Sequence, residues 1–289
     1  MIVLKLSEMN IRDPYILPFD GKYYIYSSPG KYAWNGYDGF YFSVSNDLDE
    51  WTEPEKCFDP PVGFWATNNY WAPEVHVYNG KFYLIASFKA VGHMRASQIM
   101  VSDSPEGPFE VLSYPVTPNN WMSLDGTLYV ENNVPYLVFS HEWKQTKDGE
   151  MCFLELSKDL TEPVSAPQLM FKASDAPWTT TIGDDNFVTD GPFLHKTKYG
   201  KLIMTWSSNE NGRYSIGVAV SDNGSITGNW KHCKNTLSGL DGGHSMIFKT
   251  FDGELYITMH TPNNPNGKER PVLFRIEEIP EEPFLKINA

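Results

Sequence analysis

Four carboxylates and one imidazole stand at similar places along the chain, and they have the residue types that acid–base chemistry needs. These residues are Asp13, Glu74, Asp125, Asp190 and His244. Two carboxyl groups, one protonated and one ionised, can give a proton to a bound molecule and take one from water. A neighbouring negative charge raises the pKa of a carboxyl group and so separates the two roles. We predict that the five side chains meet in one pocket. The alternative is that each one hydrogen-bonds the backbone where its strand begins.

A repeated unit explains how residues so far apart in the sequence would meet. Five times, the chain shows an apolar strand, a turn, a very apolar second strand and a third strand with small alternating residues. The turns are at Asp20-Gly21, Asn79-Gly80, Asn132-Asn133, Tyr199-Gly200 and Asp252-Gly253. Asn-Gly and Asp-Gly turns join antiparallel strands into hairpins. Units of three or four such strands, without helical periodicity, are typical of propeller blades.

The repeats therefore predict an all-β fold, a five-bladed β-propeller. The innermost strands of a propeller converge on its axis, so equivalent strand starts would bring the five polar residues together. Continuous apolar second strands fit a place buried between neighbouring blades. A β-sandwich is the alternative architecture, but it does not explain a polar residue at the same place in every unit.

Composition argues against two classes of partner. The formal net charge is −13, whereas binding to phosphates or to anionic lipid needs clustered Lys and Arg. We therefore expect neither nucleic acid nor membrane as a partner. Aromatic residues make up 15% of the chain, which favours strands and also suits stacking on the apolar faces of sugar rings.

The three cysteines, Cys57, Cys152 and Cys233, are widely spaced and form no CxxC motif, so we expect buried free thiols. Residues 1–5 lack the long apolar core of a signal peptide. A trimmed chain would look the same, which leaves the compartment open.

Four motifs resemble those of glycoside hydrolase family 43. They are Arg12-Asp13-Pro14, Trp71-Ala72-Pro73-Glu74, Ser123-Leu124-Asp125-Gly126 and Asp190-Gly191-Pro192, and their order and spacing match the family over nearly the whole chain. The resemblance implies a five-bladed propeller, in agreement with the repeat count, with residues 1–289 as a single catalytic domain. It also implies hydrolysis of α-L-arabinofuranosides or β-D-xylosides of plant-type oligosaccharides or polysaccharides, with inversion. We expect exo action.

The resemblance assigns roles to two aspartates and leaves the third role open. Asp13 matches the general base that activates water, and Asp125 matches the residue that tunes the acid. The family usually has Glu where this chain has Asp190, and the shorter side chain sets the carboxyl back by about 1 Å, which can cost on the order of 100-fold in rate. The acid is then Asp190, which we favour, or Glu142, with Glu210 as a weaker third candidate.

Other residues are candidates for substrate contacts. These are Trp71, Glu74, Trp143, His244 and Arg270, with Phe88, Trp34 and Arg213 as further candidates. For each aromatic residue the alternative is core packing. The chemistry itself requires no cofactor. The resemblance implies that His244 lies near the axis, where some relatives hold a largely hydrated calcium or sodium ion, so a structural ion beside His244 is a further expectation.

Three rival interpretations remain at this point. A carbohydrate-binding propeller that has lost catalysis would keep the aromatic residues. A relative using phosphate in place of water would need a cluster of basic residues, and a pure scaffold leaves the acid cluster unexplained. The sequence does not identify the sugar, because specificity is expected in the loops at residues 31–38 and 144–150.

Overall fold

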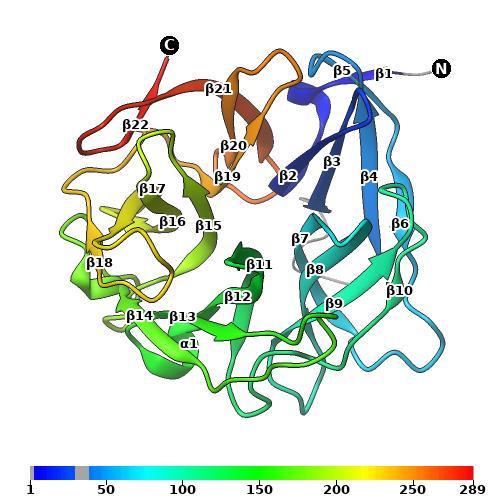
Figure 1. Cartoon of the computed structure of the whole chain (residues 1–289), viewed down its shortest axis with the longest axis horizontal. Helices are drawn as coiled ribbons and strands as arrows, with labels where there is room; N and C mark the ends of the chain where they lie inside the picture. The colour runs from blue at the N-terminus through cyan, green and yellow to red at the C-terminus, as the bar shows by residue number, and fades with distance from the viewer. Residues whose placement is uncertain (1–2, 30–38, 289) are drawn as a thin grey trace.

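The fold is a ring of five antiparallel β-sheets around a central axis (Figure 1), which confirms the predicted five-bladed β-propeller. The structure is a computed structural model, and it describes residues 3–29 and 39–288. Trp34 and the whole of the predicted specificity loop at residues 31–38 lie outside the described residues. Across the described ranges, the helices are all too short and polar to cross a membrane.

Each blade is built from consecutive strands, with the first strand at the axis and the last at the rim. The first blade holds β2 (Ile11–Phe19), β3 (Lys22–Pro29), β4 (Phe40–Ser45) and β6 (Glu55–Phe58), with β5 (Glu50–Thr52) and β1 (Val3–Lys5) at its outer edge. The second holds β7 (Asn68–Tyr78), β8 (Lys81–Lys89), β9 (Ala96–Ser102) and β10 (Glu110–Val111).

The remaining three blades repeat the four-stranded pattern. The third holds β11 (Ser123–Glu131), β12 (Val134–His141), β13 (Glu150–Glu155) and β14 (Gln168–Lys172). The fourth holds β15 (Asp190–Lys196), β16 (Leu202–Glu210), β17 (Arg213–Ser221) and β18 (Trp230–His232). The fifth holds β19 (Gly243–Lys249), β20 (Leu255–Thr261), β21 (Arg270–Glu278) and β22 (Leu285–Ile287). The helical segments are short: α1 (Trp143–Thr146), η1 (Leu6–Glu8) and η2 (Ala173–Asp175).

Local sequence explains the hairpins and the buried second strands. The turns at Asp20-Gly21 and Asn79-Gly80 have positive φ at both residues, as a two-residue type I′ turn requires. The second strands β8 and β16 are buried along nearly their whole length, because a neighbouring blade covers each face. This confirms the interpretation of the continuous apolar runs.

Aromatic side chains fill the space between the first two blades. Phe88 is fully buried, and its ring lies 4.9 Å from that of Tyr70 and 5.7 Å from that of Phe40. It is therefore a core residue, and its candidacy as a sugar-stacking residue was wrong. The cysteines are buried and free, as expected.

The seam between the first and last blades is closed by side chains. Strand β1 pairs with β5 of its own blade, and no described strand of the first blade pairs with one of the fifth. Arg12 instead pairs with the fully buried Glu269 (Nη1–Oε1, 2.9 Å), and Arg270 Nε donates to the carbonyl of Ser7 (2.8 Å). The guanidinium of Arg270 thus binds backbone at the seam, and Arg270 does not line the cavity described below.

Candidate active site

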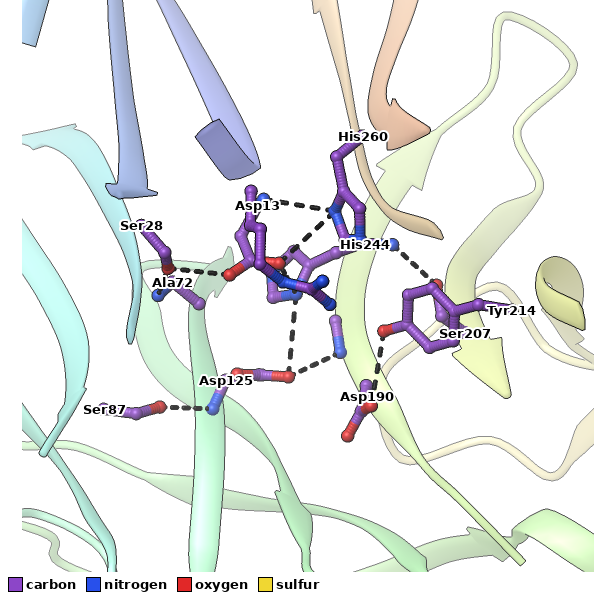
Figure 2. A network of polar contacts seen from close by, with 12 residues as sticks. Asp13, Ser28, Ala72, Ser87, Asp125, Asp190, Ser207, Tyr214, His244 and His260 are labelled. Atoms are coloured by element: carbon purple, nitrogen blue, oxygen red, sulfur yellow. Dashed lines mark hydrogen bonds and ion pairs between the residues drawn. The ribbon is translucent and has the colours of Figure 1, made fainter. Parts of the chain in front are cut away.

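A β-bulge in the first strand of every blade builds the site. At each bulge one residue has φ between +47° and +56°, and these residues are Asp13, Ala72, Asp125, Gly191 and His244. A positive φ costs an ordinary residue roughly 1–3 kcal/mol and is tolerated best by Gly, Asn, Asp and His. Bulges re-aim side chains and are common next to active sites. Here they turn Asp13, Asp125 and His244 toward the axis (Figure 2).

The bulge amides are held by groups from the neighbouring blade. The amides of Ala72, Asp125 and His244 donate to the hydroxyls of Ser28 (2.7 Å), Ser87 (2.8 Å) and Ser207 (2.9 Å), respectively. The other two amides have different acceptors. Asp13 N donates to Nδ1 of His260 (3.2 Å), and Gly191 N donates to Oδ2 of Asp125 (2.9 Å). These two exceptions involve the candidate base and the candidate tuning residue.

The bulges correct two positions in the repeat alignment. Glu74 was expected at the place of Asp13, but the bulge between Trp71 and Glu74 matches the one between Arg12 and Tyr15, so Ala72 has the place of Asp13 and Glu74 has that of Tyr15. The carboxylate of Glu74 instead pairs with His76 (Oε2–Nε2, 2.8 Å), and Glu74 does not line the cavity. In the fourth blade the equivalent residue is Gly191. Asp190 precedes the bulge, at the place that Arg12 and Trp71 occupy in their blades.

Asp13 is surrounded by groups that favour its ionised form. Ser28 Oγ donates to Oδ2 (2.7 Å), and Nδ1 of His244 lies 3.3 Å from Oδ1. Burial by itself would raise the pKa of Asp13, but His244, His260, Arg12 and the Ser28 hydroxyl hold that pKa below its ordinary value. Asp13 is therefore ionised at neutral pH, as a general base must be.

His260 and His244 differ in protonation, because the pKa of one is lowered and that of the other is raised. Burial lowers the pKa of His260 to about 4, so its ring is neutral, and its Nδ1 accepts the hydrogen bond from the backbone of Asp13. Burial also acts to lower the pKa of His244, but Asp13 and Asp125 outweigh it and the pKa is raised. His244 Nδ1 lies 3.7 Å from Oδ2 of Asp125 as well as 3.3 Å from Asp13, so its charge is shared between the two carboxylates.

Asp190 is in the opposite environment to Asp13. Burial, and next the charge of Asp125, raise the pKa of Asp190 to about 8, and Glu142 adds to the shift. Oδ2 of Asp190 accepts a hydrogen bond from the hydroxyl of Tyr214 (3.3 Å; Figure 2). Asp125 is itself shifted by burial, to a pKa of about 6. Asp190 is thus protonated at neutral pH while Asp13 is ionised, and environments that separate two carboxyl pKa values in this way mark an acid and a base.

Glu142 is buried and paired with a cation. It follows β12, and one of its oxygens binds Nη1 of the buried Arg95, while Nζ of Lys144 lies 3.6 Å from the other. The guanidinium of Arg95 also stacks on the ring of Trp71, 4.3 Å from the ring centre, and donates to Asn69 Oδ1 (3.2 Å). Arg95 therefore holds both the carboxylate of Glu142 and the indole of Trp71.

These residues enclose a cavity of about 130 Å³. Of the predicted site residues, the cavity is lined by Asp13, Trp71, Asp125, Glu142, Trp143, Asp190 and His244. Glu210 and Arg213 do not line it. They pair with each other at the β16–β17 turn (Oε2–Nη2, 3.2 Å).

Three lining residues had no assigned role in the sequence reasoning: Arg12, Leu124 and Tyr214. A fourth, Lys144, begins the predicted specificity loop at residues 144–150. The position of Arg12 beside the candidate base was a usable signal, because it stands inside the motif that singled out Asp13. Tyr214 had no comparable signal, since it lies two strands away from Asp190 in the fourth blade and its ring is set by packing on His260 of the fifth.

A directly coordinated metal ion does not fit the side chains that the structure describes. Within residues 3–29 and 39–288, His, Cys, Asp and Glu do not form a group of three or more that could hold an ion. The Nδ1 of His244 faces two carboxylates instead. A largely hydrated ion needs few protein ligands, so the expected calcium or sodium ion beside His244 stays a prediction.

Comparison with known proteins assigns this five-bladed, carboxylate-lined propeller to a class. The sequence model of the glycosyl hydrolases family 43 matches residues 6–277, and the chain belongs to that family. It is therefore a glycoside hydrolase of an inverting family, as the four motifs implied.

Particular relatives lie within this family. The chain shares 39% identity with the crystal structure of an endo-arabinase from Bacteroides thetaiotaomicron VPI-5482, covering 96% of this chain and 97% of that one, with a TM-score of 0.89. An endo-1,4-β-xylanase from the same organism shares 25% identity, covering 100% and 97%, with a TM-score of 0.80. The extracellular endo-α-(1→5)-L-arabinanase 1 of Bacillus subtilis (strain 168) is 26% identical over 70% of this chain, which spans 62% of that enzyme's length.

Proposed function

We propose that the protein hydrolyses α-1,5-linked arabinan, with Asp190 as general acid and Asp13 as general base. The observation that carries the assignment of roles is the opposite shift of their two pKa values within one cavity. The arabinan assignment is supported by similarity to two enzymes named for that substrate, one of them 39% identical over 96% of the chain.

The reaction follows from the two protonation states. Asp190 gives its proton to the oxygen of the bond being broken, which leaves with the bonding electron pair. Asp13 takes a proton from a water molecule, whose oxygen attacks the anomeric carbon from the opposite face and inverts it. Inverting enzymes keep the two carboxyl groups about 6.5–9.5 Å apart so that this water fits between them. Asp125 keeps the acid protonated at neutral pH, because its charge opposes ionisation of Asp190.

Asp190 is favoured over Glu142 because a proton donor must be protonated. One oxygen of Glu142 binds the guanidinium of Arg95 and the other lies 3.6 Å from Nζ of Lys144, so both oxygens face cations and neither is placed as a donor. We assign Glu142 an electrostatic role, since its charge raises the pKa of Asp190. Trp71, backed by Arg95, is proposed as an apolar face for a sugar ring.

Internal cleavage is proposed over exo action. The two relatives described above that are named for arabinan are both named as endo enzymes. An exo-1,5-α-L-arabinanase from a bovine ruminal metagenomic library has the same fold at 20% identity, so the expected exo action is not confirmed. Xylan is the second candidate substrate, because the endo-1,4-β-xylanase from Bacteroides thetaiotaomicron has the same fold over the whole chain at 25% identity. Carbohydrate binding without catalysis is the non-enzymatic alternative.

The test is turnover of linear α-1,5-arabinan, linear xylan and a panel of nitrophenyl glycosides by four proteins: wild type, Asp13→Asn, Asp190→Asn and Glu142→Gln. Wild type is expected to cut arabinan into a range of oligosaccharides. The turnover rate of Asp13→Asn should be about 10²–10⁴-fold lower on every substrate, since the water is no longer activated. Asp190→Asn should lose as much on arabinan but far less on nitrophenyl glycosides, whose leaving group needs no proton.

Three results would contradict the proposal. Selective loss on arabinan in Glu142→Gln, with Asp190→Asn active, would make Glu142 the acid. Release of arabinose alone from the chain ends would restore exo action. Binding of arabinan without turnover would establish the carbohydrate-binding alternative.

A further inference from the structure

The ring of Tyr214 is held in one place beside Asp190. Its backbone amide donates to Oδ1 of Asp241 (2.9 Å), and its ring faces that of the buried His260 at 5.8 Å with 24° between the planes. A side chain at Gly243 would need the space that the ring fills, because a Cβ there would lie 2.2 Å from it. Glycine at 243 therefore makes room for Tyr214, and Tyr214 has little freedom to turn away.

The phenol is placed to act as a donor to the acid. Its oxygen lies 3.3 Å from Oδ2 of Asp190, and among the described residues no other hydrogen-bond partner of this hydroxyl is found. Burial, and next the charge of Asp190, raise the pKa of Tyr214 well above its ordinary value. The hydroxyl thus keeps its proton over the pH range in which the enzyme would work.

We propose that Tyr214 is a positioning residue for the acid: by donating to Oδ2 of Asp190, it leaves the transferable proton on Oδ1. This inference rests on the proposed role of Asp190 as proton donor. A carboxylic acid has one proton for two oxygens, and an oxygen that accepts a hydrogen bond from Tyr214 is not the one that carries it. The contact also limits rotation of the carboxyl group about its last side-chain bond.

The contact strengthens as the reaction proceeds. When the proton leaves Oδ1 for the glycosidic oxygen, Asp190 becomes a carboxylate, and the hydrogen bond from Tyr214 becomes charge-assisted. Interactions that are stronger in the transition state than in the ground state accelerate the reaction. Tyr214 keeps its own proton throughout. This hydrogen bond offers one way for Asp190 to act as the acid, although its side chain is shorter than the glutamate usual in the family.

The remaining groups around Asp190 act on it through their charge. Asp125 on β11, Asp13 on β2 and Glu142 after β12 raise its pKa, and His244 on β19 lowers it. Tyr214, on β17, is the described residue that donates a hydrogen bond to its carboxyl group. The two kinds of effect can be separated, because changing Tyr214 to Phe alters the hydrogen bond without altering the charge.

The first test does not depend on turnover. Carboxyl ¹³C signals of the full chain would be followed against pH in wild type and in Tyr214→Phe, with Asp190→Asn used to assign the signal of Asp190. Loss of a donor to the charged form should raise the pKa of Asp190 by about one pH unit. An unchanged pKa would overturn the proposal. So would a lower pKa, because it would mean that Asp190 donates its proton to the phenol.

The second test separates positioning from binding. In Tyr214→Phe, kcat/KM for a linear α-1,5-arabino-oligosaccharide should fall about 10–100-fold, and that for a nitrophenyl arabinofuranoside by less than about threefold. Equal losses on both substrates would overturn the positioning role. Tyr136→Phe is the matched control, since Tyr136 packs on Phe153 in the third blade and does not line the cavity. If wild type turns over neither substrate, the proposed function fails, and the titration still decides the role of Tyr214.

Discussion

The backbone amide of Gly191 donates a hydrogen bond to Oδ2 of Asp125, at 2.9 Å. This bond joins the third blade to the fourth, and it places Asp190, the neighbour of Gly191, within the electrostatic reach of Asp125. In three of the other four blades the corresponding amide donates to a serine hydroxyl. In the blade that carries the candidate acid, the acceptor is a carboxylate instead of a neutral hydroxyl. The same contact therefore holds the bulge and brings a negative charge close to Asp190.

Asp125→Asn is expected to shift the pH profile downward. The amide oxygen of Asn can still accept the bond from Gly191, but the negative charge that raises the pKa of Asp190 is gone. The basic limb of kcat/KM, expected near pH 8 in wild type, should move to lower pH by about one unit. A pH profile on linear arabinan measures this. A basic limb that stays near pH 8 would show that Asp125 does not tune the acid, and Asp125→Ala, which also loses the acceptor, controls for the bond itself.

Removing one partner of the buried Arg95–Glu142 pair is expected to destabilise the fold. Both side chains are only 3% exposed, so each single change leaves an uncompensated buried charge. Arg95→Met and Glu142→Gln should each lower the free energy of unfolding by about 3–5 kcal/mol, and the double variant should lose less than the sum. Urea denaturation measures all three.

The exposed ion pair of Lys5 with Asp49 supplies a matched control for this cycle. Its side chains are 45% and 73% exposed, so Lys5→Met should change stability by less than about 1 kcal/mol. If the losses of unfolding free energy in Arg95→Met and Glu142→Gln add up to the loss in the double variant, the two residues do not act as a pair.

Asp190→Asn is expected to stabilise the protein at high pH. The folded-state pKa of Asp190 is about 8, against an ordinary value of 3.8, so between these values the folded protein holds a proton that the unfolded chain has released. The contribution of Asp190 to stability therefore falls as pH rises through this window. Asn does not titrate, so the free energy of unfolding of the variant should rise relative to that of wild type between pH 5 and pH 9. Denaturation at both pH values measures the difference, and a constant difference would contradict the raised pKa.

Removal of a cation is expected to affect stability more than chemistry. If a hydrated calcium or sodium ion lies beside His244, dialysis against EDTA, or replacement of Na⁺ by choline, should lower Tm while kcat stays within about twofold. Re-addition of Ca²⁺ or Na⁺ should restore Tm. A Tm that responds to neither treatment would show that no such ion stabilises the protein. Loss of kcat at unchanged Tm would contradict the view that the chemistry needs no cofactor.

Much of the fold could be predicted because its determinants are local. Asp-Gly and Asn-Gly turns set the hairpins through backbone conformation, and continuous apolar strands require cover on both faces. Such a turn stands in three of the five units and an apolar second strand in all five, so repetition predicted five blades. The acid cluster followed in part, since Asp13 and Asp125 stand at equivalent places and do line one cavity.

The errors came where register or distant contacts decide position. The bulge in β7 gives Ala72, and not Glu74, the place of Asp13, and the shared proline of Arg12-Asp13-Pro14 and Trp71-Ala72-Pro73 was a usable signal of that register. Arg270 follows a second strand, as predicted, but the closing of the ring places its guanidinium on the backbone at the seam. Phe88 has the residue type of a sugar-stacking group, yet packing between two blades buries it.

What the sequence by itself determined was the number of blades, the family motifs and the identity of most carboxylates in the cavity. These depend on residue type and short-range spacing. Only the tertiary structure decided which carboxyl group is protonated, because that depends on burial and on charges from other blades: Asp125 and Glu142 around Asp190, and His244 and Arg12 around Asp13. The same holds for Tyr214, which meets Asp190 across β16 within the fourth blade while its ring packs on His260 of the fifth, contacts that no spacing along the chain encodes.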